Sequence, residues 1–147
     1  MTTLASQLLG TWRLLSREDH TAAGERRVDP GLGSDPIAIL VYDAAGNFAA
    51  QFMKRDRSND ATLATVRRSV NNTAAVNGYD AYFGTYTVDE ASGSATQLLH
   101  ASLSPGDVGK VVTRELRVEG DRLIIQLATT SADGEPVTRT LIWVRSA

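Results

Sequence analysis

The feature that most constrains this chain is a repeated alternation of apolar and polar residues, in segments separated by turn signals. The clearest segment is 110–119, in which Val112, Arg114, Leu116 and Val118 share one face and polar residues form the other. Alternation with a period of two is typical of a β-strand with one buried face. Segments of the same kind cover residues 11–17, 79–88, 95–103, 123–129 and 137–145. The pattern predicts an all-β fold.

A hairpin adds two further strands. Apolar runs from Ile37 to Tyr42 and from Phe48 to Met53 flank the turn residues 43–47. The total is then about eight antiparallel strands, spaced as in a closed barrel or a sandwich. The length of 147 residues fits a single domain, which we expect to span residues 1–147.

Three segments break the alternation. Thr2 or Thr3 can cap a short helical turn that ends at Gly10. Residues 19–36 are rich in glycine, proline and charge, and we interpret them as a loop that forms a flap over the barrel mouth. Between the third and fourth strands, residues 55–78 carry apolar side chains three to four apart, which predicts a helical lid segment.

Composition excludes several classes of protein. The net charge is −2, and no dense basic and aromatic patch indicates nucleic acid. Cysteine is absent, which excludes disulfides and thiolate catalysis. The sequence has neither a signal-peptide pattern nor an apolar run of membrane-spanning length, so we expect a cytoplasmic protein without membrane contact. His20 and His100 lack the spacing of metal ligands, and we predict neither a metal nor a cofactor.

The two ends of the chain predict how the barrel closes. Gly10-Thr11-Trp12 opens the first strand, and Arg145 ends the last one. We expect the Trp12 indole to cap the core and the Arg145 guanidinium to lie across it in a cation–π contact. Both residues are therefore interpreted as structural.

An ordered set of segments resembles the bacterial lipocalin-like domain family over nearly the whole chain. The segments are Leu9-Gly10-Thr11-Trp12-Arg13-Leu14, Ile39 to Gly46, Ala81 to Asp89, Gly120-Asp121-Arg122-Leu123 and Leu141-Ile142-Trp143-Val144-Arg145. The resemblance implies a closed antiparallel barrel of the calycin type with a central cavity. It implies little about chemistry, because fold does not fix function, although related bacterial barrels include enzymes that cyclise or isomerise natural products. The chain departs from the family at His100, where members often carry an acid, and near Asp107, where an aromatic residue is missing.

Arg114 is the first candidate for chemistry, because the alternation of its strand places a permanent charge among inward apolar residues. A buried guanidinium needs a carboxylate partner, or a ligand that is anionic or bears a carbonyl. Two structural alternatives stay open. Arg114 can pair with a barrel acid such as Asp80, or a shift of register can leave it at the rim.

His100 and Tyr82 complete the expected catalytic set. His100 has a side chain suited to proton transfer near neutral pH, but the facing of its apolar strand is open, and an outward structural histidine is the alternative. Tyr82 can orient a carbonyl or donate a proton, or it can simply pack in the core. The expected ligand-binding residues are Tyr86, Gln51, Tyr42, Phe52 and Leu116.

Two functions follow from these residues. The first is an enzyme that binds a small, largely apolar or carbonyl-bearing metabolite and converts it without a cofactor, in a cyclase or isomerase step of natural-product biosynthesis. The second is a carrier or sensor of a small hydrophobic ligand inside the cell. A homodimer is one possible assembly, and the sequence identifies neither the substrate nor the reaction.

Overall fold

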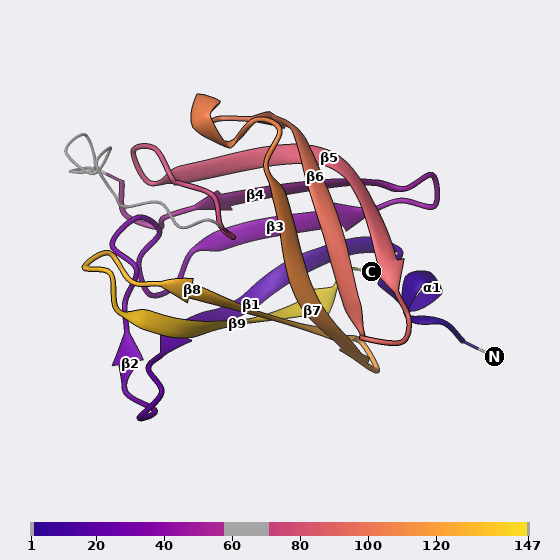
Figure 1. The fold of residues 1–147 in the computed structure, drawn as a ribbon, viewed down its shortest axis with the longest axis horizontal. Coiled ribbons are helices and arrows are strands. Elements are labelled where there is room, and N and C mark those ends of the chain that lie inside the picture. The colour runs from indigo at the N-terminus through magenta and orange to yellow at the C-terminus, as the bar shows by residue number, and fades with distance from the viewer. Residues whose placement is uncertain (1, 58–70, 147) are drawn as a thin grey trace.

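The computed structural model describes residues 2–57 and 71–146, which form an antiparallel sheet of nine strands that curls around a common interior (Figure 1). In chain order the elements are α1 (Leu4–Leu8), β1 (Gly10–His20), β2 (Arg26–Arg27), β3 (Ile37–Tyr42), β4 (Asn47–Met53), β5 (Tyr79–Asp89), β6 (Ser94–Ser102), the 3₁₀ helix η2 (Pro105–Asp107), β7 (Val111–Glu119), β8 (Arg122–Thr130) and β9 (Pro136–Arg145). The short helical turn and the eight predicted strands lie within a few residues of where capping and alternation place them, whereas β2 and η2 were not predicted.

The sheet closes because its first long strand pairs with its last. The strand order is β2-β1-β3-β4-β5-β6-β7-β8-β9, and β1 also pairs with β9, from Trp12 opposite Arg145 to His20 opposite Thr138. The two-residue β2 only extends the edge of β1, so eight strands form the barrel wall. The prediction of a closed, eight-stranded antiparallel barrel is confirmed.

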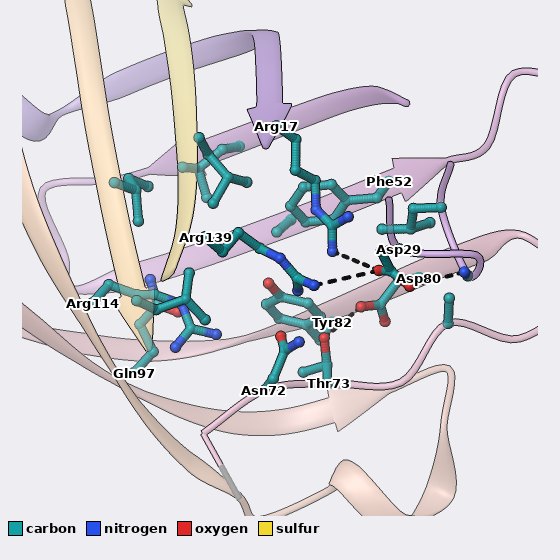
Figure 2. A pocket seen from close by; sticks show the side chains of 18 of the residues that line it. Arg17, Asp29, Phe52, Asn72, Thr73, Asp80, Tyr82, Gln97, Arg114 and Arg139 are labelled. Carbon is teal, nitrogen blue, oxygen red and sulfur yellow. Dashed lines mark hydrogen bonds and ion pairs between the residues drawn. The ribbon is translucent and has the colours of Figure 1, made fainter. Parts of the chain in front are cut away.

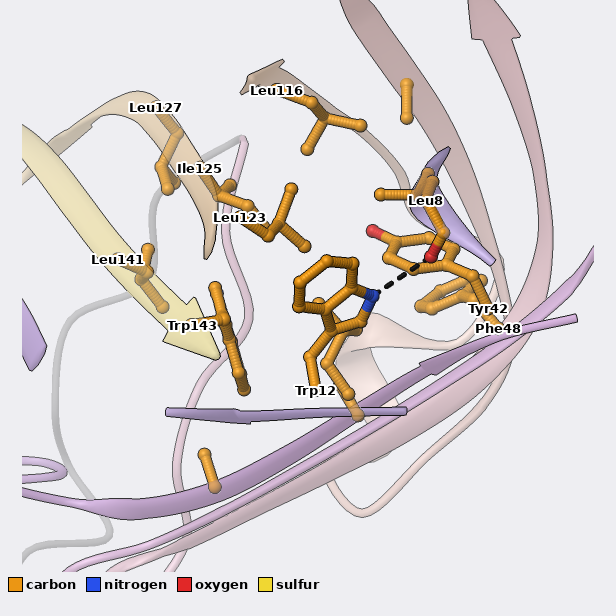
Figure 3. Packing of buried hydrophobic residues seen from close by; sticks show 14 of the residues in the cluster. Leu8, Trp12, Tyr42, Phe48, Leu116, Leu123, Ile125, Leu127, Leu141 and Trp143 are labelled. Carbon is orange, nitrogen blue, oxygen red and sulfur yellow. Dashed lines mark hydrogen bonds between the residues drawn. The ribbon is translucent and has the colours of Figure 1, made fainter. Parts of the chain in front are cut away.

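The closed end of the barrel is built as the two chain ends predicted. The Trp12 indole is fully buried, and its Nε1 donates to the backbone oxygen of Leu8 at 2.9 Å (Figure 3). The Arg145 guanidinium lies 4.2 Å from the Trp12 ring centre and donates to the carbonyls of Leu9 and Gln7. These contacts fix α1 across the end of the barrel and leave the opposite end for a binding site.

A bulge in β1 changes which residues of that strand face inward. The pairing with β9 shifts register between Leu14 and Ser16. Strict alternation puts Trp12, Leu14 and Ser16 on one face of the strand, but beyond the bulge Arg17 and Asp19 are the buried residues. An extra residue in one strand reverses the facing of everything after it, which is why the sequence pattern missed two charged interior side chains.

The connections that were expected to cover the barrel differ from the predictions. The expected loop over residues 19–36 is shorter, because β1 continues to His20 and residues 26–27 pair with it as β2. The predicted helical lid over residues 55–78 rests mainly on residues 58–70, which lie outside the described residues. Among the helices that the structure describes, none has the length and apolar character needed to span a membrane.

Candidate functional site

A cavity lies inside the barrel at the end opposite Trp12. The volume that the centres of water molecules can occupy in this cavity is about 60 Å³. This volume corresponds to roughly four to six water molecules, so the cavity suits a compact ligand of one or two rings. One wall is apolar and includes Leu40, Phe52, Leu127, Leu141 and Trp143. The other wall carries an unusual number of charged side chains, which Figure 2 shows converging from several strands.

Two of the three arginines that line the cavity are paired with carboxylates. Arg139 on β9 makes a bidentate contact to Asp19, with 2.7 Å and 2.9 Å between nitrogen and oxygen, and both residues are almost fully buried. Arg17 donates to Asp29 at 3.0 Å, and Arg139 lies 3.5 Å from the same Asp29 oxygen. Burial alone would raise the pKa of Asp29, but Arg17 and Arg139 outweigh burial and hold that pKa below its ordinary value. The two arginines and the two aspartates of this network therefore neutralise one another.

Arg114 on β7 is the third arginine, and its contacts differ. Only 6% of it is exposed, which confirms the inward facing expected from alternation. Its Nη1 donates to the backbone oxygens of Asn71 at 2.9 Å and Thr113 at 3.0 Å and to the Asn71 side chain at 3.4 Å, and the guanidinium also forms a hydrogen bond with the Tyr82 side chain. None of the described carboxylates forms an ion pair with it, so the alternative of a pair with Asp80 is wrong. Burial lowers the pKa of Arg114, while the neighbouring hydroxyls of Tyr82 and Tyr42 act in the opposite direction.

The 71–75 segment covers one side of the cavity and is fixed to the barrel by buried polar groups. Besides the contact from Arg114, the backbone nitrogen of Ala74 donates to Asp107 at 2.9 Å, and Ser104 donates to the Ala74 oxygen at 3.1 Å. Lys110 donates to the oxygen of Asn72 and pairs with Asp107 at 3.0 Å. The segment is therefore held on the cavity by residues from η2, β7 and the loops between them.

Asp80 on β5 is the one lining acid with no arginine partner in the described residues. It is 4% exposed, its Oδ2 accepts a hydrogen bond from Thr73, and its Oδ1 has no hydrogen-bond partner there. Burial raises the pKa of Asp80 to about 6; Asp107 adds to this, whereas the bond from Thr73 and the charge of Arg17 oppose it. A carboxyl group of this kind can exchange a proton with a ligand near neutral pH.

Tyr82 lies between Arg114 and Asp80 in the cavity (Figure 2). Burial and the charge of Asp80 raise the pKa of Tyr82 to about 12, although Arg114 opposes the shift. Tyr42 accepts a hydrogen bond from the buried Gln97 at 2.6 Å, and burial also raises the pKa of Tyr42. Both hydroxyls stay protonated at neutral pH and can donate hydrogen bonds to a ligand.

Four of the residues predicted as a site line this cavity together: Arg114, Tyr82, Tyr42 and Phe52. They come from β7, β5, β3 and β4, so the barrel brings together positions that are far apart in the chain. Their roles toward a ligand stay predictions.

The structure places the other predicted residues elsewhere. His100 is exposed on the outer face of β6, where its Nε2 lies 3.3 Å from the hydroxyl of Thr85, so the open question of its facing is settled against the cavity. Gln51 is also exposed, and it accepts a hydrogen bond from Tyr79 on the outer surface. The prediction of His100 and Gln51 as residues of the ligand site is therefore wrong for this cavity, because Leu99, Ala50 and Phe52 take the inward positions of their strands.

Tyr86 and Leu116 belong to the core near the closed end. The Tyr86 ring packs edge-on against Tyr42 at 4.7 Å between centres, and its hydroxyl donates to the backbone oxygen of Asp43. Leu116 is buried among core residues, and neither it nor Tyr86 lines the cavity.

Sequence reasoning missed Arg17, Asp29 and Arg139 and treated Asp80 only as a partner for Arg114. Two signals were present. Arg139 alternates in phase with the buried Val137, Leu141 and Trp143, and Asp80 in phase with Tyr82, as Arg114 does on its own strand. Arg17 and Asp29 gave no such signal, because the inward facing of Arg17 depends on the bulge in β1 and the position of Asp29 depends on a loop. No group of three or more histidine, aspartate or glutamate residues in the described part of the chain is arranged to hold a metal ion.

Among the comparisons with known proteins, the match to a family model supports the fold. A bovine odorant-binding protein in complex with a selenium-containing odorant aligns with 100% of this chain and 74% of its own, at 12% identity and a TM-score of 0.47, which is too distant to support an argument about function. No curated protein matches the sequence. The family model of the lipocalin-like domain matches residues 9–146. The chain therefore belongs to the lipocalin-like domain family.

Proposed function

We propose that the barrel binds a small, largely apolar molecule in its cavity and that Arg114 holds a carbonyl or carboxylate oxygen of this ligand. The observation that carries the proposal is the contrast among the three lining arginines. Arg17 and Arg139 have carboxylate partners, whereas Arg114 is equally buried and, among the described residues, contacts only the uncharged oxygens of Asn71, Thr113 and Tyr82. A buried guanidinium in this state gains from a further acceptor that a ligand brings.

The apolar wall of the cavity determines which kind of ligand body fits beside the polar group held by Arg114. Phe52 and Trp143 pack edge-on at 5.7 Å between ring centres and present apolar surface to the cavity. Such a wall favours an aromatic or aliphatic body, while a few polar groups fix its orientation. A combination of an apolar wall and a few polar groups is expected of a small-molecule site in the lipocalin-like family. A cytoplasmic location, a bacterial source and a homodimer stay predictions.

Conversion of the ligand is the second part of the proposal, with a non-catalytic carrier or sensor as the alternative. We propose an isomerase or cyclase step without a cofactor, because the cavity offers a proton-exchanging acid, two protonated tyrosines and a fixed cation within one enclosed space. A carrier needs the cation and the apolar wall but has no use for the acid.

Binding is tested by calorimetry with 2-tetralone, a compact ketone, and tetralin, which has the same rings without the carbonyl. We expect the wild-type protein to bind 2-tetralone about tenfold more tightly than tetralin, and Arg114→Met to abolish most of this preference. Lys110→Met is the matched control, since Lys110 also holds the 71–75 segment but does not line the cavity. Absence of binding by both compounds, or an unchanged preference in Arg114→Met, contradicts the proposed function.

A further inference from the structure

Arg114 and Asp80 are the two charged groups of the cavity that do not take part in the ion pairs of Arg17 and Arg139. Asp19 and Asp29 have arginine partners, whereas Asp80 accepts hydrogen bonds from the Thr73 hydroxyl and the backbone of Ala81 and has no arginine partner among the described residues. A buried cation and a buried anion would gain by contact, yet this pair stays apart across Tyr82 (Figure 2). The separation leaves one group free to hold an oxygen and the other free to take a proton.

We propose that Asp80 is the general base of a proton transfer at the carbon next to a carbonyl group whose oxygen is held by Arg114. The inference rests on the proposed function, because it takes the ligand to be oriented by Arg114. It assigns to Asp80 the role in proton transfer that the sequence analysis assigned to His100. It also narrows the class of substrate to an enolisable carbonyl compound.

The step balances without any cofactor or oxidant. The carboxylate of Asp80 takes a proton from the carbon next to the carbonyl, and the electron pair of the broken C–H bond forms a C=C bond. The electrons of the C=O bond move onto oxygen, where the guanidinium of Arg114 stabilises the enolate. Asp80 then returns the proton to the same carbon or, where the ligand has a C=C bond between its β and γ carbons, to the γ carbon. The second outcome moves a double bond and is an isomerisation.

The charge of the cavity favours a neutral substrate. Three arginines, Arg17, Arg114 and Arg139, are matched by three acids, Asp19, Asp29 and Asp80, so the site is neutral when Asp80 is ionised. A neutral ketone enters without adding a buried charge, whereas a carboxylate would add one. An enolate formed in place is accompanied by a protonated Asp80, so the total charge of the site does not change during the step.

The surroundings of Asp80 suit this role. The groups that act on it are Arg17 from β1, Thr73 from the 71–75 segment, Tyr82 from its own strand and Asp107 from η2, which is itself paired with Lys110. Burial raises the pKa of Asp80 to about 6, so the group is ionised in neutral solution and is a stronger base than an ordinary carboxylate. Thr73 opposes the shift and is thereby a positioning residue that sets the pKa of the base.

The test is the exchange of the acidic protons of 2-tetralone in deuterium oxide, followed by proton NMR. We expect the wild-type protein to accelerate exchange over buffer, and Asp80→Asn to lose about 100-fold of that acceleration while binding 2-tetralone within about twofold of wild type. Glu115→Gln, which removes an exposed acid of β7, is the matched control and should exchange as the wild type does. The wild-type rate should rise with pH, reach half its plateau near the pKa of Asp80, and level off.

Thr73→Val keeps the proposal testable if Asp80→Asn does not fold. Loss of the Thr73 hydrogen bond should move the midpoint of the rate to higher pH, because that bond favours the ionised carboxylate. A merely structural Thr73 would leave the midpoint unchanged. Binding that depends on Arg114 without accelerated exchange, or exchange that survives in Asp80→Asn, overturns the role of Asp80 and leaves the proposed function intact. A wild-type protein that binds neither 2-tetralone nor tetralin overturns the proposed function itself.

Discussion

Substitution of Asp80 by asparagine should stabilise the barrel near neutral pH. Asp80 is buried, lacks an arginine partner in the described residues and has one oxygen without a hydrogen bond there. Ionisation of such a group costs free energy in the folded state but not in the unfolded chain. Asparagine has nearly the same shape, keeps an oxygen that can accept from Thr73, and carries no charge.

The size of the effect follows from the pKa. Burial raises the pKa of Asp80 from 3.8 to about 6. The folded state therefore binds this proton more tightly than the unfolded state, so the free energy of unfolding falls as the pH rises from about 4 to about 6. The cost is about 3 kcal/mol at pH 7.5 and about 1 kcal/mol at pH 4.5, since one pKa unit corresponds to about 1.4 kcal/mol.

Urea denaturation of the wild type and Asp80→Asn at the two pH values measures this difference. We expect Asp80→Asn to be more stable by about 3 kcal/mol at pH 7.5 and by only about 1 kcal/mol at pH 4.5. Thr73→Val is the control with the opposite sign: it removes the hydrogen bond to the ionised carboxylate, so it should destabilise more at pH 7.5 than at pH 4.5. An Asp80→Asn variant whose change in stability is equal at both pH values would show that Asp80 does not titrate as described.

Three further substitutions test the frame around the site. Arg139→Met leaves the buried Asp19 without its bidentate partner and should cost about 3–5 kcal/mol, or roughly 10–15 °C in Tm by calorimetry; a fall of under about 3 °C would contradict a desolvated pair. Gly84→Ala should prevent soluble expression or unfold the barrel, because a Cβ at this bulge would lie 1.8 Å from the backbone oxygen of Leu98; a protein with the circular dichroism and stability of the wild type would refute that close approach. Arg145→Met removes a cation–π contact and two hydrogen bonds at the closed end, so it should lower stability by about 1–2 kcal/mol while the affinity for 2-tetralone stays unchanged, and a weaker affinity would indicate coupling between the two ends.

Much of the barrel could be predicted because strand facing is a local property. The alternation of Val112, Arg114 and Leu116 places them inward whatever the rest of the chain does, and the structure agrees. The same local rule carried no answer for His100, because both faces of its strand are rich in apolar residues and either register satisfies the pattern. In the structure Leu99 takes the interior position and His100 faces outward.

The candidate site was predictable only in part, because it depends on which side chains meet. Tyr82 and Arg114 follow from alternation, but the pairing of Arg139 with Asp19 joins residues 120 positions apart through the closure of β1 on β9. Arg17 turned inward only through the bulge, whose position no local pattern announced. The lack of an arginine partner for Asp80 could be seen only in the structure, since alternation shows that a carboxylate faces inward but not whether an arginine pairs with it.

The sequence by itself determined the all-β wall, the closed end at Trp12 and Arg145, and the inward direction of Arg114, because alternation and turn residues act within a few positions of the chain. Tertiary structure alone decided which interior charges neutralise one another. Ion pairing in a desolvated interior depends on distances of a few ångströms between strands that are remote in sequence, and closure of the barrel sets those distances. That closure gave Arg139 its partner Asp19, the bulge in β1 turned Arg17 toward Asp29, and Arg114 and Asp80 lie on either side of Tyr82.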